Sequence, residues 1–330
     1  MNTREFIHTK VNNLYEEVPY PLWDHKKRVS KLPNEILRYK YLNIDHVLEN
    51  ANVLDVGCGT GNRSILAAKY FKVKKLYGFD ACKKSLEIAS KVAKEENFDN
   101  FIPIHGDLFN LPFDDNFFDV VISWGVLHHT YNPKLGLKEM HRVCKYDGYI
   151  GFFVYNSFAD WRHNLQRKDV LSNGGKTTEE KLSYALKHYG KTNKYKGLKK
   201  IEDFSQELLT EFRDEFIHPH KSDHTINEIL DWQKELSIEF SGSFPPMRFR
   251  DTISWIKDRY QMRKKYPISK SKLVNLVGFI SSLFPRRKLF CKLPSKFHIV
   301  LWHLFYFLQG ADGSFSHGPV IAGKKTRNNY

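Results

Sequence analysis

From about residue 50 onward, short apolar runs alternate with segments whose apolar residues recur at helical spacing. Such runs, flanked by glycines and acids, are typical of buried strands, and apolar positions three and four residues apart indicate helices. Strands are predicted at NVLDVG (52–57), KKLYGFD (74–80), FIPIHGD (101–107), FDVVISWG (118–125) and GYIGFFVY (148–155). Helices are predicted at 62–71, 83–96 and 133–145. This alternation favours an α/β fold built on a doubly wound, mostly parallel sheet.

The residues that end the predicted strands are the ones expected at a ligand site. In doubly wound sheets, ligands bind at the carboxyl ends of the strands. Acids stand at the ends of the first three predicted strands, at Asp55, Asp80 and Asp107. A carboxylate accepts hydrogen bonds, which suits two ribose hydroxyls at Asp80 and an adenine amino group at Asp107. Three acids together disfavour a phosphate and favour a cationic nucleoside.

The glycine turn after the first strand distinguishes this chain from common nucleotide-binding families. Glycines stand at 57, 59 and 61, but a dinucleotide fingerprint needs its third glycine where Asn62 stands. The Gly-Lys-Ser/Thr ending of a phosphate-binding loop does not follow either. The turn therefore predicts a ligand that is neither a dinucleotide nor a nucleoside triphosphate.

Taken together, four segments resemble the class I S-adenosylmethionine-dependent methyltransferases, in particular the branch that methylates small, quinone-like or lipid-like molecules. The segments are VLDVGCGTG (53–61), GFD (78–80), GDLFNLPFDDNFFDVVISWGVLHHT (106–130) and EMHRVCKYDGYIGFF (139–153). The resemblance implies S-adenosyl-L-methionine as cofactor, with the glycine loop under its methionine part, Asp80 on its ribose and Trp124 near its sulfonium. It implies these cofactor-binding residues: Asp55, Gly57, Gly59, Gly61, Asp80, Ala81, Asp107, Leu108 and Trp124.

The resemblance also implies a seven-stranded, Rossmann-like sheet whose last two strands lie far along the chain. HTINEILDWQKELSIEFSG (224–242) is similar to a helix and the sixth strand, and SHGPVIAGKK (316–325) to an antiparallel seventh. YEEVPYPLW (15–23), stiffened by two prolines, suits either a lid over the cofactor or plain packing. The expected parts are an N-terminal helical cap and lid (1–50), a cofactor-binding core (51–155), a helical insertion that caps the substrate (156–223), the continued core (224–243), a basic aromatic helical insertion (244–314) and the last strand with a tail (315–330).

Two histidines just past the fourth strand are the candidates for a catalytic base. Methyl transfer to a hydroxyl or an acidic carbon requires a proton acceptor, and imidazole titrates near neutral pH. His128 and His129 either serve in this way or only shape the loop before Asn132 and Pro133, a suitable N-cap and first helical residue. The fourth strand lacks the [Asp/Asn/Ser]-Pro-Pro-[Tyr/Phe] tetrad of many nitrogen methyltransferases. Oxygen or carbon is therefore the expected acceptor atom.

The run HPHKSDH (218–224) contains side chains that could bind a metal. Its candidate ligands are His218, His220, Asp223 and His224. The run resembles the H-x-H-x-D-H motif of metallo-β-lactamases but has one residue too many. We therefore expect no metal there. We expect a turn that leads into a helix capped by Asp223 or Thr225, with the histidines facing the substrate cavity or solvent.

Composition and charge indicate the cellular compartment of the protein and the kind of partner it could bind. Four scattered cysteines without a C-x-x-C pair disfavour a disulfide framework, and the first residues lack the apolar run of a secretory signal, so a cytoplasmic protein is expected. The net charge is +15, and residues 251–330 contain 15 Lys and Arg against three acids. Such a basic region either binds an anionic partner, a membrane surface or nucleic acid, or is only a solvated face.

Two apolar stretches inside the basic region bear on the choice of partner. KLVNLVGFISSLF (272–284) and FHIVLWHLFYFLQG (297–310) are shorter than the ~20 residues that span a bilayer. Flanking Lys and Arg suit an interfacial helix at an anionic membrane, with Trp302 and Phe305 in the lipid boundary. The alternative is that both helices simply pack on the core.

The sequence therefore predicts a methyltransferase that acts on oxygen or carbon of a small, apolar or lipid-like acceptor, in the cytoplasm or at the inner membrane face. Two alternatives remain open at this point. An RNA methyltransferase would use the basic region to neutralise phosphates, although no RNA-binding module is recognisable and nucleic acid is the less favoured partner. A non-catalytic protein would bind the cofactor without turnover.

Overall fold

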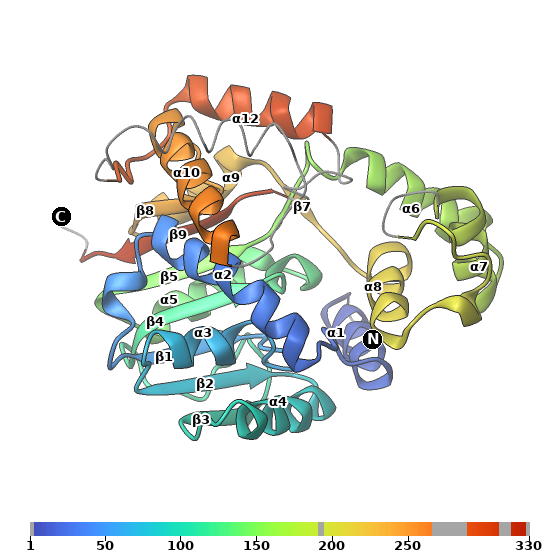
Figure 1. The fold of residues 1–330 in the computed structure, drawn as a ribbon, viewed down its shortest axis with the longest axis horizontal. Coiled ribbons are helices and arrows are strands. Elements are labelled where there is room, and N and C mark those ends of the chain that lie inside the picture. Colours follow the sequence, from blue (N-terminus) through green and yellow to red (C-terminus); the bar gives the residue numbers. More distant parts are fainter. Residues whose placement is uncertain (1–2, 191–194, 266–288, 310–317, 328–330) are drawn as a thin grey trace.

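The computed structural model describes residues 3–190, 195–265, 289–309 and 318–327, and its centre is a seven-stranded sheet in the order β3-β2-β1-β4-β5-β9-β8. The strands are β1 (Asn52–Val56), β2 (Lys75–Asp80), β3 (Phe101–His105), β4 (Phe118–Trp124), β5 (Cys144–Phe153), β8 (Ile238–Phe244) and β9 (Val320–Lys325). Strand β9 runs antiparallel between β5 and β8, and the other neighbouring pairs are parallel. The α/β, doubly wound, Rossmann-like fold is therefore confirmed (Figure 1).

Helices cover both faces of this sheet. One face packs against α5 (Pro133–Val143), α9 (Ile226–Glu235) and α12 (Lys296–Gln309). The other face packs against α2 (His25–Tyr41), α3 (Ser64–Tyr70), α4 (Lys83–Glu95) and α10 (Phe249–Lys265). Central residues such as Leu54, Val121 and Ile122 are fully buried. Because both faces of the sheet are covered, its strands are almost continuously apolar, which explains why they are readable in the sequence.

Two helix starts follow the expected capping chemistry. Asn132 caps α5, since its Oδ1 accepts the N–H of Leu135 at 3.0 Å, and Pro133 is the first helical residue. Thr225 caps α9, since its Oγ1 accepts the N–H of Glu228 at 3.2 Å. Of the two caps considered for α9, Thr225 is therefore the one used.

The segment between β5 and α9 forms a small helical subdomain, called the cap below. It contains α6 (Trp161–Asn173), α7 (Thr178–Tyr189), α8 (Gln206–Ile217) and a short 3₁₀ turn, Ile201–Asp203. The helices share an apolar cluster of their own around Phe212 and Phe216. Two short strands, β6 (Tyr155–Asn156) and β7 (Asp223–His224), pair in parallel where the cap leaves and rejoins the sheet domain. Figure 1 shows the cap beyond the carboxyl end of β2.

The first fifty residues divide between the ligand end of the sheet and its core. Helix α1 (Thr3–Glu17) lies near α8 and α4, beyond the carboxyl end of the sheet (Figure 1). Helix α2 instead packs on a sheet face, where Leu37, Tyr39 and Tyr41 are buried, and a 3₁₀ turn (Asp45–Val47) leads into β1. Only the part before α2 therefore lies over the site, whereas the sequence suggested one cap for all of 1–50.

The predicted basic insertion is described in part. Helix α10 and helix α12 belong to it, whereas the apolar stretch 272–284 lies outside the described residues. The expectation that Trp302 contacts lipid is wrong, because the register of α12 turns its ring inward and its Nε1 donates to the Met247 carbonyl at 2.8 Å. Phe305 remains 40% exposed. Within the described residues, no helix has the length and apolar character needed to cross a membrane.

Candidate functional site

A cavity of about 290 Å³ opens at the carboxyl ends of the central strands. Nine of the residues expected at the site line it: Asp55, Gly57, Gly59, Asp80, Ala81, Asp107, Leu108, Trp124 and His129. Two others lie just behind its wall. Gly61 packs against Ile65 and Ala89, and His128 stacks on Tyr155 with 3.8 Å between the ring centroids. The cavity therefore gathers residues from four strand ends that are far apart in the sequence.

The glycine loop presents bare backbone to this cavity. Gly57 and Gly59 have positive φ angles of 74° and 53°. A Cβ atom at Gly59 would clash with the carbonyl oxygen of Tyr20, and one at Gly57 would overlap the side chain of Val126. Because glycine adopts this conformation without strain and has no Cβ, the loop can pack directly against Tyr20 and Val126 at the edge of the cavity.

Asp80 is held firmly at the end of β2. Its Oδ2 accepts the N–H of Gly59 at 2.8 Å, and its Oδ1 accepts the N–H of Cys82 at 2.8 Å. Burial raises the pKa of Asp80, and these two amide bonds act against that rise. Each carboxylate oxygen has a further acceptor position, so the side chain can still receive two hydroxyl groups from a ligand.

The other two acids differ in their surroundings. Burial raises the pKa of Asp55 to about 7, and the negative charge of Asp80 acts in the same direction. A ligand with a positive charge would favour the ionised form of Asp55. Asp107 accepts the N–H of Phe109 at 3.0 Å and so fixes the turn after β3. The three acids give the cavity floor a negative character suited to a cationic nucleoside.

Trp124 ends β4, and its expected placement near a sulfonium stays a prediction. It borders the cavity, but its indole packs edge-on against Tyr39, with centroids 6.1 Å apart, and the Arg38 guanidinium lies 5.5 Å from its ring centroid. A Cβ at Gly151 would contact the same ring. The indole therefore supports the strand end from the face covered by α2.

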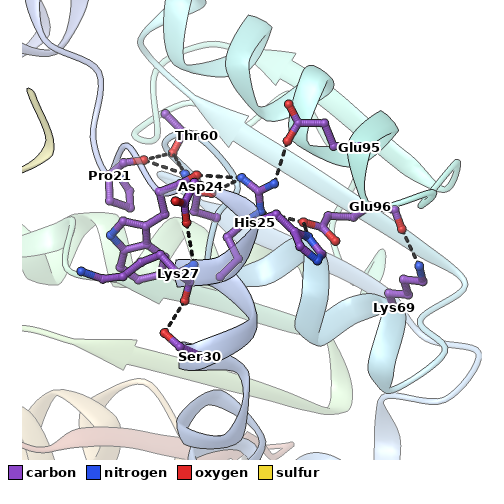
Figure 2. Close-up of polar contacts among 12 residues, drawn as sticks. Pro21, Asp24, His25, Lys27, Ser30, Thr60, Lys69, Glu95 and Glu96 are labelled. Carbon is purple, nitrogen blue, oxygen red and sulfur yellow. Dashed lines mark hydrogen bonds and ion pairs between the residues drawn. The ribbon is translucent and has the colours of Figure 1, made fainter. Parts of the chain in front are cut away.

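The stiff segment before α2 is tied directly to the glycine loop. The Pro21 carbonyl accepts the amide Nδ2 of Asn62 at 2.6 Å and also the hydroxyl of Thr60. The Tyr20 carbonyl accepts the N–H of Thr60 at 3.4 Å. Figure 2 shows these contacts around Pro21 and Thr60. Asn62, which stands where a dinucleotide fingerprint has glycine, thus holds the segment before α2 in place.

A buried ion cluster supports the same segment from below. Arg28 donates to the Trp23 carbonyl at 2.7 Å and to Asn62 Oδ1 at 3.2 Å, and it pairs with Glu96 at 2.7 Å and Glu95 at 2.6 Å. The side chains of Arg28 and Glu96 are each only 3% exposed. Figure 2 labels Glu95 and Glu96 of this cluster and marks its hydrogen bonds and ion pairs with dashed lines. The cluster therefore couples the segment before α2, the glycine loop and the end of α4.

His129 is held in a fixed orientation by the loop that follows α8. Its Nδ1 lies 2.9 Å from the carbonyl oxygen of His220. Since a carbonyl can only accept, Nδ1 carries the proton in the neutral ring, and Nε2 has the free lone pair. Burial lowers the pKa of His129, whereas the negative charge of Asp214 opposes that change. At neutral pH the ring is therefore a neutral base.

The loop that orients His129 is tied to β4 by further bonds. His220 Nε2 donates to the Thr130 carbonyl at 3.1 Å, and the Ser222 N–H donates to the His128 carbonyl at 2.8 Å. Arg167 from α6 donates to the His218 carbonyl. The turn 218–222 thus connects the cap to the end of β4 and fixes the imidazole that faces the cavity.

The cap and α1 supply a wall that the sequence analysis did not identify. It is rich in tyrosines and acids: Tyr15, Tyr20, Tyr155, Glu211, Asp214 and Glu215. The Tyr15 hydroxyl donates to Asp214 at 3.0 Å, and Lys221 lies 4.7 Å from the Tyr155 ring centroid. The signal for this wall was the spacing of the three acids, which places them on one face of α8.

The metal-like run does not gather its four side chains. His224 bonds Glu228 at 2.8 Å and Ser222 at 3.0 Å, and Asp223 accepts from Asn164 at 2.7 Å. A different group, His129, Asp214 and His218, places three potential ligand atoms within 4.8 Å of one another.

The geometry of that second group is better suited to donating and accepting protons than to binding a metal ion. The rings of His129 and His218 stack, with centroids 3.7 Å apart and planes at 30°. Lone pairs in nearly parallel ring planes do not converge at a metal–nitrogen distance of about 2.1 Å. In addition, His218 Nδ1 accepts the N–H of His220 at 3.2 Å, which leaves the proton of the neutral ring on Nε2. His218 therefore presents a donor.

Known proteins resemble this chain in sequence. A family profile described as "Methyltransferase domain" matches residues 48–215, which is half of the chain. The demethylmenaquinone methyltransferase of Staphylococcus epidermidis is 30% identical over 149 residues, covering 44% of this chain and 59% of that enzyme. That of Bacillus subtilis is 32% identical over 143 residues, covering 43% and 61%. The chain thus spans about six tenths of the length of these relatives.

Among solved structures, an S-adenosylmethionine-dependent methyltransferase from Aquifex aeolicus is 24% identical, with a TM-score of 0.34, over 41% of this chain and 75% of its own. The profile match spans the glycine loop, the acids at the strand ends, His129 and most of the cap. The bare glycine backbone and the acidic floor also fit the cofactor of that family. This chain belongs to the class I S-adenosylmethionine-dependent methyltransferases.

Proposed function

We propose that this methyltransferase transfers a methyl group to an oxygen or carbon of a small, lipid-like acceptor with a hydroxylated aromatic ring, and that His129 is its base. The observation that carries the proposal is the orientation of His129, whose Nδ1 is fixed by the His220 carbonyl while the ring lines the cavity. The similar enzymes above are named for demethylmenaquinone, which supports a quinone-like acceptor.

The cofactor half of the cavity is assigned to the glycine loop and the acids. Asp80 would hold the ribose hydroxyls, Asp107 and Leu108 the adenine, and the backbone at Gly57 and Gly59 the methionine part. When bound, S-adenosylmethionine supplies an activated methyl group, so the protein's share is binding, orientation and exclusion of water. The segment around Pro21, tied to Thr60 and Asn62, covers this half.

His129 would accept the acceptor's proton at Nε2 as the new bond to the methyl carbon forms. The electron pair of the broken carbon–sulfur bond stays on sulfur. The imidazolium produced is stabilised by the carboxylate of Asp214, whose charge favours the protonated form of His129. Asp214 is in turn oriented by the Tyr15 hydroxyl. A positioned base of this kind contributes ~10²–10⁴-fold to a rate.

The cap wall supports recognition of the acceptor. Phenol rings of Tyr15, Tyr20 and Tyr155 offer apolar faces to a planar ring. Carboxylates on α8 accept hydrogen bonds from ring hydroxyls. Burial raises the pKa of Tyr15 and Tyr155 well above the usual value, so both phenols stay protonated and uncharged beside the acceptor. We further propose that the enzyme works in the cytoplasm at the inner face of the membrane.

The test is transfer of radiolabelled methyl groups to short-chain demethylmenaquinol, catechol, an alkyl diamine and tRNA. We expect methyl transfer to demethylmenaquinol or to catechol. In His129→Asn the rate of transfer should fall ~10²-fold or more, while the affinity for the cofactor stays unchanged. His128→Asn, which changes the neighbouring ring behind the wall, is the matched control and should retain most of the rate. Wild-type turnover in His129→Asn, or transfer only to the diamine or the tRNA, would contradict the proposal.

A further inference from the structure

One face of α12 exposes a continuous series of large apolar side chains, called the apolar stripe below. Its members are Phe297, Val300, Leu304, Phe305, Phe307 and Leu308, which are between 40% and 65% exposed. Phe297, Val300, Leu304 and Leu308 recur three or four residues apart and therefore lie on one side of the helix. At about 1.5 Å per residue, the 14-residue helix carries the stripe for roughly 20 Å.

The opposite side of α12 belongs to the protein core. Ile299, Trp302 and Tyr306 are buried in the cluster that also contains α9 residues. The helix is therefore held in a fixed register, and the stripe is not the result of a loosely attached segment. Figure 1 shows α12 as the outermost element of the molecule, at the top of the view.

Side chains from other elements extend the stripe at both ends. Phe249 of α10 lies 6.4 Å from Phe297, measured between ring centroids. At the other end, Trp161 of α6 stacks on Phe307 with centroids 5.0 Å apart, and its Nε1 donates to the Phe307 carbonyl at 3.0 Å. An apolar surface of this extent is uncommon on a protein that has no partner.

The described segment that contains the stripe has charges of one sign. Residues 289–309 contain Lys292 and Lys296 and no acid. Both lysines are exposed, as are Arg250 beside the first end of the stripe and Arg162, whose guanidinium lies 5.0 Å from the Trp161 ring centroid. A rigid apolar face bordered by cations is complementary to a bilayer with anionic headgroups.

We propose that the apolar stripe seats the enzyme on an anionic lipid bilayer, with the side chains of α12 in the headgroup boundary and the lysines and arginines at lipid phosphates. RNA is the less suitable partner, because its bases stack on separate aromatic rings within a basic groove, whereas these apolar residues are contiguous and the cations lie at their borders.

This inference deepens the proposed function, because the stripe leads to the acceptor side of the cavity. Trp161, which stacks on Phe307, begins α6, and His163 two residues later lines the cavity. Next to it, Lys221 of the cavity wall pairs with the buried Asp160. The stripe and the acceptor side of the cavity are thus connected through the first turn of α6.

The test is co-sedimentation of the full chain with vesicles of phosphatidylcholine alone and with one third phosphatidylglycerol. We expect binding to the anionic vesicles, weakened about tenfold or more in the double variant Leu304→Ser/Leu308→Ser. The variant Tyr70→Ser/Tyr146→Ser removes two similarly exposed aromatic rings elsewhere and should bind like wild type. Equal vesicle binding by the α12 variant would overturn the proposal, as would retention on tRNA without vesicle binding.

Two further measurements distinguish a failure of the membrane proposal from a failure of the proposed function. If sedimentation shows a wild-type dimer that the α12 variant converts to a monomer, the stripe is a subunit interface and the proposal is overturned. Transfer to soluble catechol, measured in parallel, reports on the proposed function alone. Transfer without vesicle binding would reject only the membrane surface, and vesicle binding without transfer to any acceptor would reject only the proposed function.

Discussion

Replacing Arg28 with methionine tests whether the buried ion cluster holds the segment before α2 and the glycine loop together. Methionine keeps an apolar chain of similar length but removes the bonds to the Trp23 carbonyl, Asn62, Glu95 and Glu96. Glu96 would then remain buried beside His25, whose Nδ1 lies 2.9 Å from Glu96 Oε1. The Glu96 carboxylate therefore stays buried but loses the positive charge and the hydrogen bond of Arg28, which offset the cost of its burial.

The size of the effect follows from that burial. Removing one partner of a buried pair costs about 3–5 kcal/mol. With an unfolding entropy of about 2.1 cal/mol/K per residue, the 330 residues give roughly 0.7 kcal/mol/K. The expected fall in Tm is therefore about 4–7 °C. Lys72→Met is the control, because its pair with Glu49 is well exposed and is worth at most about 1 kcal/mol.

Calorimetric melting with and without S-adenosylmethionine measures both stability and cofactor affinity. A second variant, Arg28→Met/Glu96→Gln, removes the stranded charge and should recover part of the loss. Burial alone would raise the pKa of Glu96, but His25 and Arg28 hold it below its usual range. The ionised Glu96 therefore stabilises the folded protein fully above about pH 4.3, the usual pKa of glutamate. This stabilisation is lost as the pH falls through the lower pKa that Glu96 has in the folded protein. A Tm for Arg28→Met within 1–2 °C of wild type, on the same entropy scale, would refute the reasoning.

Two other predictions concern the cavity. Asp80→Ala should lower the affinity for S-adenosylmethionine by about tenfold or more, since a charge-assisted hydrogen bond is worth ~1.5–3 kcal/mol. Titration calorimetry measures this affinity, and an unchanged value would contradict the assignment of Asp80 to the ribose. For the base, burial lowers the pKa of His129, so with the cofactor saturating, the loss of activity that His129 causes begins as the pH falls below the usual histidine value of about 6.5. A pH profile of kcat/KM with its acid limb at or above that value would argue against His129.

The central sheet and its ligand end were predictable because they depend on local pattern. Apolar strands buried on both faces are visible as continuous runs, and the loop at Gly57 and Gly59 and the acids at Asp55 and Asp80 follow them directly. The topology of the last two strands was accessible only through the resemblance to a family. Nothing in the local pattern shows that β9 inserts between β5 and β8.

The cap wall and the orientation of single side chains could not be predicted in the same way. Asp214 and Tyr15 meet although 199 residues separate them, which depends on how α1 and α8 pack. His128 and His129 are adjacent in the sequence, but only His129 borders the cavity. Trp302 was assigned to the lipid boundary from composition alone, whereas the register of α12 buries it and exposes Leu304 and Leu308 instead.

The paired strands β6 and β7 make the cap an exchangeable module. Residues Tyr155 and Asp223 are register partners, so the 67 residues between them leave and re-enter the fold at nearly one point. The free energy needed to close a loop at such a point rises by only about 0.6 kcal/mol for each doubling of the loop length. Caps of very different size can therefore be inserted there without disturbing the cofactor half. A change of acceptor, during evolution or by engineering, would then centre on this one segment, and a new cap would again have to supply the carbonyl that holds His129.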